Sequence, residues 1–172
     1  MEEFHISSEK IIIREMQDAD IEAIYSYRSL PEIARYQYWK PFTKEQTVDF
    51  VSKCKHPQLD KQDEWIGLAI EKEGNLIGDC AFKISDGTAE IGCNISPEYQ
   101  NQGLAKEALC ILINYCFKNR DVNQIIGITD SNNSASIKLM ESLGMKKNPD
   151  FENRVICKGE ESIEYKYSMK GK

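Results

Sequence analysis

The spacing of apolar residues changes several times along this chain, and each change marks a predicted element. Residues 10–14 (KIIIR) carry three consecutive β-branched side chains, which predicts a short strand. From residue 18 to residue 30, apolar side chains recur every three or four positions and predict an amphipathic helix that ends at Pro31. Residues 43–46 (TKEQ) have the form of a capping box and predict the start of a second helix.

The middle of the chain predicts strands joined by short turns. Residues 64–71, 76–84 and 89–95 are apolar runs separated by turn residues at 74–75 and 85–88. Three strands connected in this way predict an antiparallel meander.

Helical spacing then returns and alternates with further strands. The remaining predicted elements are a helix over residues 103–117, a strand over 123–129, a helix over 133–142, and two strands over 151–157 and 162–169. Gly144 follows the second of these helices at the position where glycine commonly ends a helix.

The order of these elements predicts an α/β (α+β) fold. We expect one mixed, mostly antiparallel sheet of about seven strands, with about four helices on both faces. The strand, helix and strand between residues 89 and 129 predict a right-handed parallel crossover. A chain of 172 residues has the length of one domain, so we expect a single domain over residues 1–172.

Composition narrows the function classes. The net charge of −6 argues against a general nucleic-acid binder, because such proteins release counterions through clustered Lys and Arg. No apolar run approaches the ~20 residues that span a bilayer, and residues 1–5 (MEEFH) lack the apolar core of a secretory signal. We therefore expect a cytoplasmic protein that binds neither nucleic acid nor membrane.

The cysteines and histidines do not form a metal-binding pattern. None of the six cysteines forms a C-x-x-C pair, and the two histidines, His5 and His56, lie far apart in the sequence. Most of the cysteines occur in apolar stretches, such as Cys110 and Cys116. We expect them to be small buried side chains in a reducing compartment, with no metal bound.

Candidate chemistry lies in residues 96–107 (SPEYQNQGLAKE), which join a predicted strand to a predicted helix. A glycine near the start of the helix leaves backbone N–H groups pointing outward at the positive end of the helix dipole. Such groups bind a pyrophosphate, although an ordinary strand-to-helix loop has the same features. The phosphate loops of P-loop and Rossmann proteins are absent from the sequence.

Residues 100–105 (QNQGLA) resemble the Q/R-x-x-G-x-G/A motif of the GNAT acyl-CoA N-acyltransferases. Residues 129–136 (TDSNNSAS) and 139–145 (LMESLGM) follow in the order that is typical of this family. Residues 11–15 and 163–169 resemble the first and last strands of the ribosomal-protein N-terminal acetyltransferase (RimJ/RimL-type) group. The resemblance covers nearly the whole chain and implies transfer of an acetyl group from acetyl-CoA to a primary amine, foremost the α-amine of a protein or peptide.

The resemblance also implies which residues contact acetyl-CoA. Cys93 and Ile95 would offer backbone groups to the pantetheine arm, and Asn133 would lie near the cosubstrate. Asn133 also has the position of a helix N-cap, and the two roles are compatible. The pyrophosphate would be held by the main-chain N–H groups of Gln100, Asn101, Gln102, Gly103, Leu104, Ala105 and Lys106.

The catalytic residues are less clear, because Met140 stands where many members of the family have a tyrosine general acid. Methionine cannot donate a proton. Ser136, one turn earlier, is the candidate replacement, unless it only bonds a backbone carbonyl. Glu90 shares a strand face with Gly92 and Asn94 and is the candidate general base, with a solvated edge charge as the alternative.

On the acceptor side, Trp39 lies in a segment expected to shape acceptor binding. Tyr165 and Tyr167 alternate onto one strand face, where they line either the acceptor site or the core. Arg28 and Arg35 are candidates for pairing with acceptor carboxylates, with plain surface charge as the alternative.

We expect direct attack by the amine in a ternary complex, with a backbone N–H near Ile95 stabilising the oxyanion. A covalent route through Cys93 is the competing mechanism. A small amine (a polyamine, an antibiotic or a toxin) is the alternative acceptor, and a catalytically silent acyl-CoA sensor is the alternative function. The sequence leaves the oligomeric state open, including a homodimer.

Overall fold

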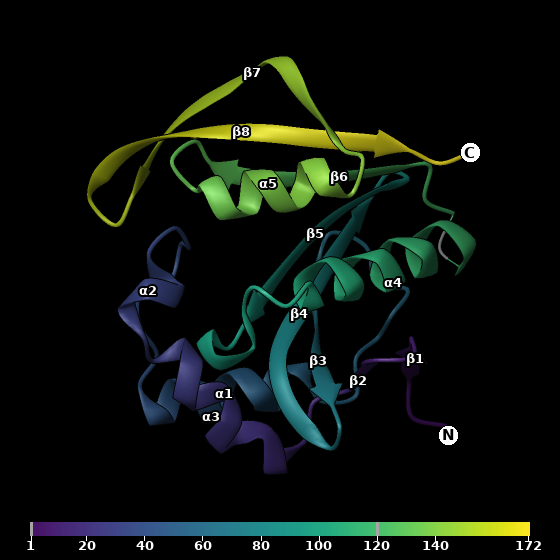
Figure 1. Ribbon diagram of the computed structural model, residues 1–172, viewed down its shortest axis with the longest axis vertical. Helices are drawn as coiled ribbons and strands as arrows, with labels where there is room; N and C mark the ends of the chain where they lie inside the picture. Colours follow the sequence, from purple (N-terminus) through teal and green to yellow (C-terminus); the bar gives the residue numbers. More distant parts are fainter. Residues whose placement is uncertain (1, 120) are drawn as a thin grey trace.

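The computed structural model describes residues 2–119 and 121–172, and over these residues the chain forms a single mixed sheet with helices on both faces (Figure 1). The order of the eight strands in the sheet is β1-β2-β3-β4-β5-β6-β8-β7. The strands are β1 (His5–Ser7), β2 (Ile12–Arg14), β3 (Ile66–Lys72), β4 (Asn75–Ser85), β5 (Thr88–Ile95), β6 (Gln124–Asp130), β7 (Lys146–Cys157) and β8 (Glu160–Lys170). The α-helices are α1 (Ile21–Arg28), α2 (Pro31–Ala34), α3 (Lys44–Cys54), α4 (Leu104–Asn119) and α5 (Ser134–Ser142), and two 3₁₀ turns lie at Asp18–Asp20 and Pro97–Tyr99.

The predicted fold class, the antiparallel meander and the parallel crossover are confirmed. Strands β3, β4 and β5 pair antiparallel in sequence order. β5 pairs with β6 in parallel through the intervening helix α4. The β5–β6 ladder contains only three pairs, which end at Glu90 and Ile126, and the two strands then diverge (Figure 1).

Several helix boundaries follow from capping chemistry, as expected. Thr43 caps α3, because its side chain accepts from the Gln46 N–H while the Gln46 side chain accepts from the Thr43 N–H. Gly144 follows α5 with a φ of 87°, a left-handed backbone conformation that glycine adopts without steric cost.

The elements near the N-terminus differ from the prediction in two places. An extra strand, β1, pairs with β2, and its three residues are too few and too polar to produce a sequence pattern. Pro31 not only follows the first helix but also begins the short helix α2, where its missing N–H costs nothing.

Near the C-terminus, β7 begins five residues earlier than predicted, at Lys146, and its register with β8 shifts between Lys147 and Glu152.

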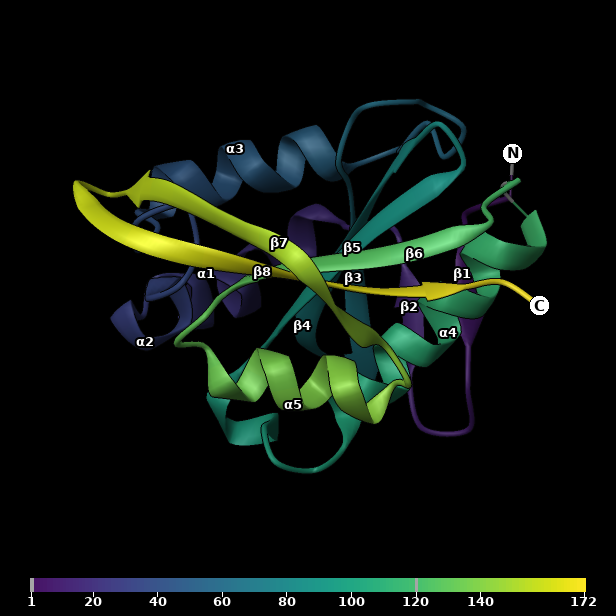
Figure 2. The same cartoon turned by 90° about the horizontal axis from the view of Figure 1, so that it is seen from above.

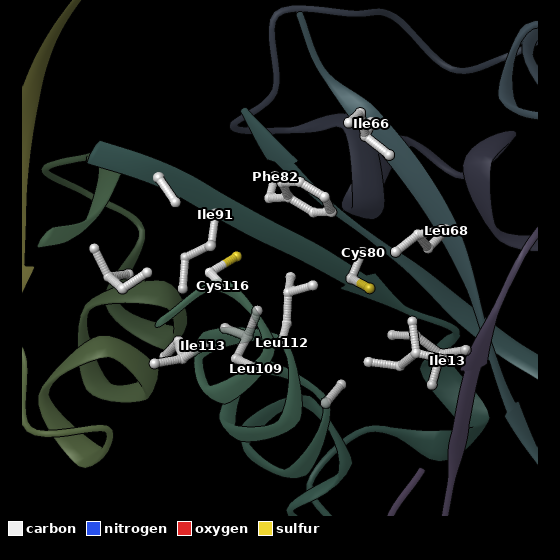
Figure 3. Packing of buried hydrophobic residues seen from close by; sticks show 14 of the residues in the cluster. Ile13, Ile66, Leu68, Cys80, Phe82, Ile91, Leu109, Leu112, Ile113 and Cys116 are labelled. Atoms are coloured by element: carbon white, nitrogen blue, oxygen red, sulfur yellow. The ribbon is translucent and has the colours of Figure 1, made fainter. Parts of the chain in front are cut away.

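The main core lies between the sheet and helix α4 (Figure 3). Leu112 and Cys116 of α4 pack toward Phe82 and Ile91 of the central strands. A smaller core lies under α1 and α3 on the opposite face (Figure 2), and its members are Met16, Ile24, Tyr27, Val51 and Ala69.

The cysteines are only partly as expected. All six are free thiols, and Cys80 and Cys116 are fully buried in the main core. Cys110 is exposed, because it lies on the outer face of α4 and not on the face that meets the sheet. Within residues 2–119 and 121–172, no helix combines the length and apolar character needed to traverse a bilayer.

Candidate functional site

The gap between β5 and β6 is the first part of the site. β5 continues to Ile95 and β6 to Asp130, but their ladder ends at Glu90 and Ile126. Strands that separate in this way turn main-chain N–H and C=O groups toward the gap. The gap therefore offers an extended ligand the hydrogen bonds that a neighbouring strand would otherwise make.

The loop at the end of β5 leads to an open helix N-terminus. Gln100 donates from Nε2 to the Ile95 carbonyl at 2.9 Å, which folds the loop back onto the end of the strand. Asn101 and Gly103 both have left-handed backbone, with φ of 61° and 76°. Gly103 precedes Leu104, the first residue of α4, and a side chain there would meet no atom within 4 Å.

This geometry fits a pyrophosphate. The first N–H groups of α4 have no acceptor within their own helix, and Gly103 brings no side chain to cover them. The positive end of the helix dipole therefore faces an open surface, beside the exposed amine of Lys106. Gln100 contributes to this arrangement through its side chain, a role that the motif alone did not indicate.

The start of helix α5 is the second part of the site. Asn133 accepts from the Ser136 N–H through its side-chain oxygen at 3.2 Å, so its predicted role as an N-cap is confirmed. Ser136 is half-buried in the first turn. Met140, one turn later, is 5% exposed and belongs to the main core, which explains why an apolar side chain stands there.

Glu90 is the last residue of β5 that pairs with β6, and it is half-buried. Burial raises the pKa of the Glu90 carboxyl, and Glu164 raises it further, while Lys83 and Lys166 act in the opposite direction. Glu90 is therefore a half-buried carboxyl of raised pKa at the point where β5 and β6 separate, a property that many general bases share.

Glu90 shares a sheet face with the residues under α1 and α3. It pairs with Lys83, and four residues further along β5 Asn94 pairs with Asp79, on the same face of the sheet. Asp79 in turn pairs with Ala69, a member of the small core under these helices. Helix α4 covers the other face of the sheet.

Residues 35–43, between α2 and α3, contact Arg28 of α1 and the β7–β8 hairpin, and we call them the acceptor segment. The Tyr38 hydroxyl donates to the Glu164 carboxylate on β8. Lys158, at the tip of the β7–β8 hairpin, donates from Nζ to the carbonyls of Ala34 at 2.7 Å and Trp39 at 3.4 Å.

A pocket of about 660 Å³ lies between the acceptor segment and the β7–β8 hairpin. Arg35 and Tyr36 line one side, Asp130 lies at the end of β6, and Glu160 and Glu161 come from the hairpin. Whether Arg35 pairs with an acceptor carboxylate stays a prediction.

The prediction for Arg28 was wrong in both of its alternatives. Arg28 is 6% exposed and is neither a surface charge nor free to bind an acceptor carboxylate, because Asp79 already pairs with its guanidinium. Tyr167 is 4% exposed and belongs to the core. Tyr165 is half-buried, and the Lys147 amine lies 3.8 Å from the centre of its ring.

Three site residues had no signal in the sequence: Tyr38, Lys158 and Glu164. Their partners lie more than 100 positions away in the chain, so no local pattern marks them. Over the part of the chain that the structure describes, no group of three or more His, Cys, Asp or Glu side chains is arranged to hold a metal ion.

Comparison with known proteins agrees with this geometry. A family model described as an acetyltransferase (GNAT) domain matches residues 10–146. The N-acetyltransferase YnaD of Bacillus subtilis (strain 168), itself uncharacterized, is 32% identical over 168 residues, which cover 96% of each chain. The crystal structure of a GNAT-family acetyltransferase from Bacillus anthracis is 28% identical, covers 97% of this chain and 98% of its own, and superposes with a TM-score of 0.87.

Two more distant structures share the fold. RimL, a ribosomal L7/L12 α-N-protein acetyltransferase solved with coenzyme A, is 15% identical with a TM-score of 0.83 over 97% of this chain and 98% of its own. Spermidine N-acetyltransferase from Vibrio cholerae, solved with coenzyme A and spermine, is 18% identical with a TM-score of 0.79 over 95% and 96%. The open helix N-terminus and the gap between β5 and β6 are consistent with the family model and with the nearer relatives. The chain therefore belongs to the GNAT family and is an N-acetyltransferase that uses acetyl-CoA.

Proposed function

We propose that this enzyme acetylates the α-amine of a protein or peptide N-terminus by direct attack in a ternary complex. The observation that carries the proposal is the position of Glu90, a desolvated carboxylate at the point where β5 and β6 separate. The amine gives up a proton to Glu90, directly or through water, and its nitrogen then attacks the thioester carbonyl. Coenzyme A leaves and takes a proton, for which Ser136 is the proposed donor.

The α-amine suits this site because its ammonium form loses a proton more easily than that of other amines. Its pKa is about 8, against about 10.4 for a lysine-type amine, so a larger share is already neutral at pH 7. A single carboxylate base of raised pKa therefore needs to deprotonate a smaller share of such an acceptor. Tyr38 in the acceptor segment is 66% exposed, so a peptide acceptor can contact the segment from solvent.

The acetyl-CoA side of the proposal uses the residues that the motif indicated. Cys93 and Ile95 offer backbone groups to the pantetheine arm, residues 100–106 surround the pyrophosphate at the start of α4, and Asn133 lies at the start of α5. A backbone N–H at the end of β5 is the proposed oxyanion donor. We further propose that residues 1–172 act as one N-acetyltransferase domain and work in the cytoplasm, where six free cysteines stay reduced.

A small polycationic amine is the second candidate acceptor. Asp130, Glu160 and Glu161 line the pocket beside the acceptor segment, and carboxylates attract such a ligand. The spermidine acetyltransferase named above shares the fold, but at 18% identity this supports the scaffold and not the substrate.

Release of the coenzyme A thiol, measured with two acceptor sets, tests the proposal. One set contains short peptides with a free N-terminus, each paired with the same peptide blocked at that amine. The other set contains spermidine, spermine and lysine derivatives. The proposal predicts turnover of free peptides only, whereas turnover of polyamines alone would replace it with the second candidate.

Glu90→Gln tests the base in the same assay. The amide keeps the size of the side chain but cannot accept the proton, and a lost general base typically lowers kcat by roughly 10²–10⁴-fold. Glu73→Gln is the matched control, because Glu73 is exposed in the turn between β3 and β4. Full turnover by Glu90→Gln would remove Glu90 from the mechanism.

A further inference from the structure

Arg28 lies where helix α1, strand β4 and the acceptor segment meet. Its Nε donates to Oδ2 of Asp79 at 3.0 Å, and its Nη2 donates to Oδ1 at 2.8 Å. Asp79 also accepts from the hydroxyl of Tyr27 and, at 3.3 Å, from Nδ2 of Asn94. Although burial acts to lower the pKa of Arg28, Asp79 raises it above its ordinary value, so the guanidinium stays charged inside the fold.

The acceptor segment is attached to this buried guanidinium. The Cζ atom of Arg28 lies 4.5 Å from the ring centre of Trp39 and 5.0 Å from that of Phe42, both in the segment, and 4.1 Å from Phe50 on α3. The Phe42 N–H also donates to the Arg28 carbonyl at 2.9 Å. Two aromatic rings and one backbone bond of the segment are therefore placed by Arg28.

The Arg28–Asp79 ion pair is also connected to β5, the strand that carries the candidate base Glu90. Asp79 on β4 pairs with Asn94 on β5, and Asn94 lies on the same face as Glu90. The outer edge of the segment is tied to β8 by the Tyr38–Glu164 hydrogen bond. The segment thus extends from a buried ion pair to an exposed hydrogen bond, across the face that carries Glu90.

We propose that Arg28 is a positioning residue, which sets the acceptor segment over Glu90 and thereby determines the affinity for the amine. Stability alone does not call for this arrangement, because buried ion pairs are often replaced by apolar side chains without loss of stability. Two bonds to one carboxylate, made while three rings surround the cation, require the forked guanidinium, which lysine does not provide. The proposal rests on the proposed function only in placing the acceptor on the Glu90 face.

Arg28→Lys is the central test, because it keeps the charge and removes the planar geometry. We expect the KM for the amine to rise by about tenfold, which corresponds to a loss of about 1.4 kcal/mol in binding. The KM for acetyl-CoA should not change, because Arg28 reaches β5 through Asp79 and Asn94 and the main-chain pairing of β5 with β4 does not depend on Arg28. Any amine that the enzyme turns over serves in this measurement.

Arg14→Lys is the matched control. Arg14 donates to both oxygens of Asp20 at 2.9 Å and also bonds Glu71, so it loses the same kind of planar pairing. It holds β2 to the 3₁₀ turn before α1 and has no bond to the acceptor segment. We expect the KM for the amine to stay at the wild-type value in this variant.

Fluorescence of Trp39 reports the position of the acceptor segment in the absence of any acceptor. The chain has two tryptophans, and Trp65 is 49% exposed, so Trp65→Phe leaves Trp39 as the single reporter. Adding Arg28→Lys should shift the Trp39 emission and increase its quenching by iodide, whereas adding Arg14→Lys should not. Unchanged Trp39 emission together with an unchanged KM for the amine would overturn the proposal.

An apolar triple variant separates positioning from folding. Tyr27→Phe, Arg28→Met and Asp79→Leu together remove the three buried polar side chains, and only the half-buried Asn94 loses a hydrogen-bond partner. We expect this variant to fold and bind acetyl-CoA, yet to show the raised KM for the amine. A folded triple variant with the wild-type KM would show that the ion pair serves only the core. If instead Glu90→Gln keeps full turnover while Arg28→Lys still raises the KM for the amine, Glu90 is not the general base. The positioning role of Arg28 is then still supported.

Discussion

Met140 of α5 covers Gly127 of β6 so closely that a methyl group on Gly127 would lie 2.4 Å from the Met140 sulfur. Met140 occupies the position where many relatives carry a tyrosine general acid, and here it fills the core instead. The absence of a β-carbon on Gly127 is what lets the thioether lie against the strand. The contact therefore gives each of the two residues a packing role.

This contact predicts that Gly127→Ala destabilises the protein. The added methyl group displaces a buried side chain, and overpacking of this kind typically costs about 1–3 kcal/mol. Urea unfolding measures the change in the free energy of unfolding. The matched control is Gly92→Ala on β5, where a β-carbon meets no atom within 4 Å and the stability should not fall.

Met140→Leu should leave kcat unchanged, because Met140 contributes volume and no proton. Exchanges that conserve volume usually cost less than about 1.5 kcal/mol, so the variant should fold normally. Steady-state kinetics with a saturating amine provide the test. A large drop in kcat with an unchanged free energy of unfolding would contradict the structural role of Met140.

The pH dependence of the rate should follow the charges around Glu90. Activity needs the carboxylate, so the rate falls as pH drops through the pKa of Glu90, which burial raises above its ordinary value. Lys166 lowers this pKa and Glu164 raises it. Lys166→Met should therefore move the acidic limb of the kcat/KM profile to higher pH, and Glu164→Gln should move it to lower pH. Shifts in the same direction for both variants would contradict Glu90 as the base.

Glu90 should also affect stability in a pH-dependent way. A carboxyl whose pKa is raised in the folded state favours folding most below its unfolded pKa, and that contribution is lost as pH rises through the folded pKa. Glu90→Gln should consequently stabilise the protein at pH 7 but not at pH 4. Thermal midpoints at the two pH values measure this, and Glu73→Gln on the surface should show no such difference.

Gly103→Val should weaken binding of acetyl-CoA. A β-branched residue is strained at a φ of 76°, and left-handed backbone costs such residues about 1–2 kcal/mol, so the start of α4 must rearrange. A loss of about 1.4 kcal/mol in binding corresponds to tenfold in Kd. The rise in thermal midpoint with added acetyl-CoA should therefore shrink.

Gly144→Val is the matched control for Gly103→Val. Gly144 has a φ of 87° and equally open surroundings, but it follows α5 and is not part of the loop before α4. It should lose stability by a similar amount and keep the full response to acetyl-CoA. Equal loss of that response in both variants would mean that general destabilisation, and not the loop, controls binding.

Cys93→Ala should keep most of its activity. Burial, with a smaller contribution from Asp79, raises the pKa of Cys93 to about 12, so almost no thiolate exists at neutral pH. The backbone groups proposed to bind the pantetheine arm remain in the variant. Loss of activity together with an acetylated enzyme intermediate in mass spectrometry would establish the covalent route instead.

Local interactions determined much of this protein from the sequence alone. The capping box at Thr43, the N-cap at Asn133 and the glycine after α5 act within a few residues, so they mark helix ends before any tertiary contact forms. The loop before α4 is equally local, because a glycine at a helix start exposes N–H groups whatever lies around it. The fold class and the order of the elements other than β1 and α2 therefore followed from sequence patterns, and the acetyl-CoA motif followed from its resemblance to the family.

The tertiary structure alone decided the acceptor side. The Arg28–Asp79 pair joins residues 51 positions apart, and the Tyr38–Glu164 bond joins residues 126 apart. Arginine and glutamate on a helix or strand look like surface charges in sequence, since nothing local indicates whether a partner will be buried with them. Packing of α1 on β4 buries the Arg28–Asp79 ion pair, and packing of the β7–β8 hairpin beside the acceptor segment forms the Tyr38–Glu164 hydrogen bond. Both interactions therefore depend on the tertiary structure.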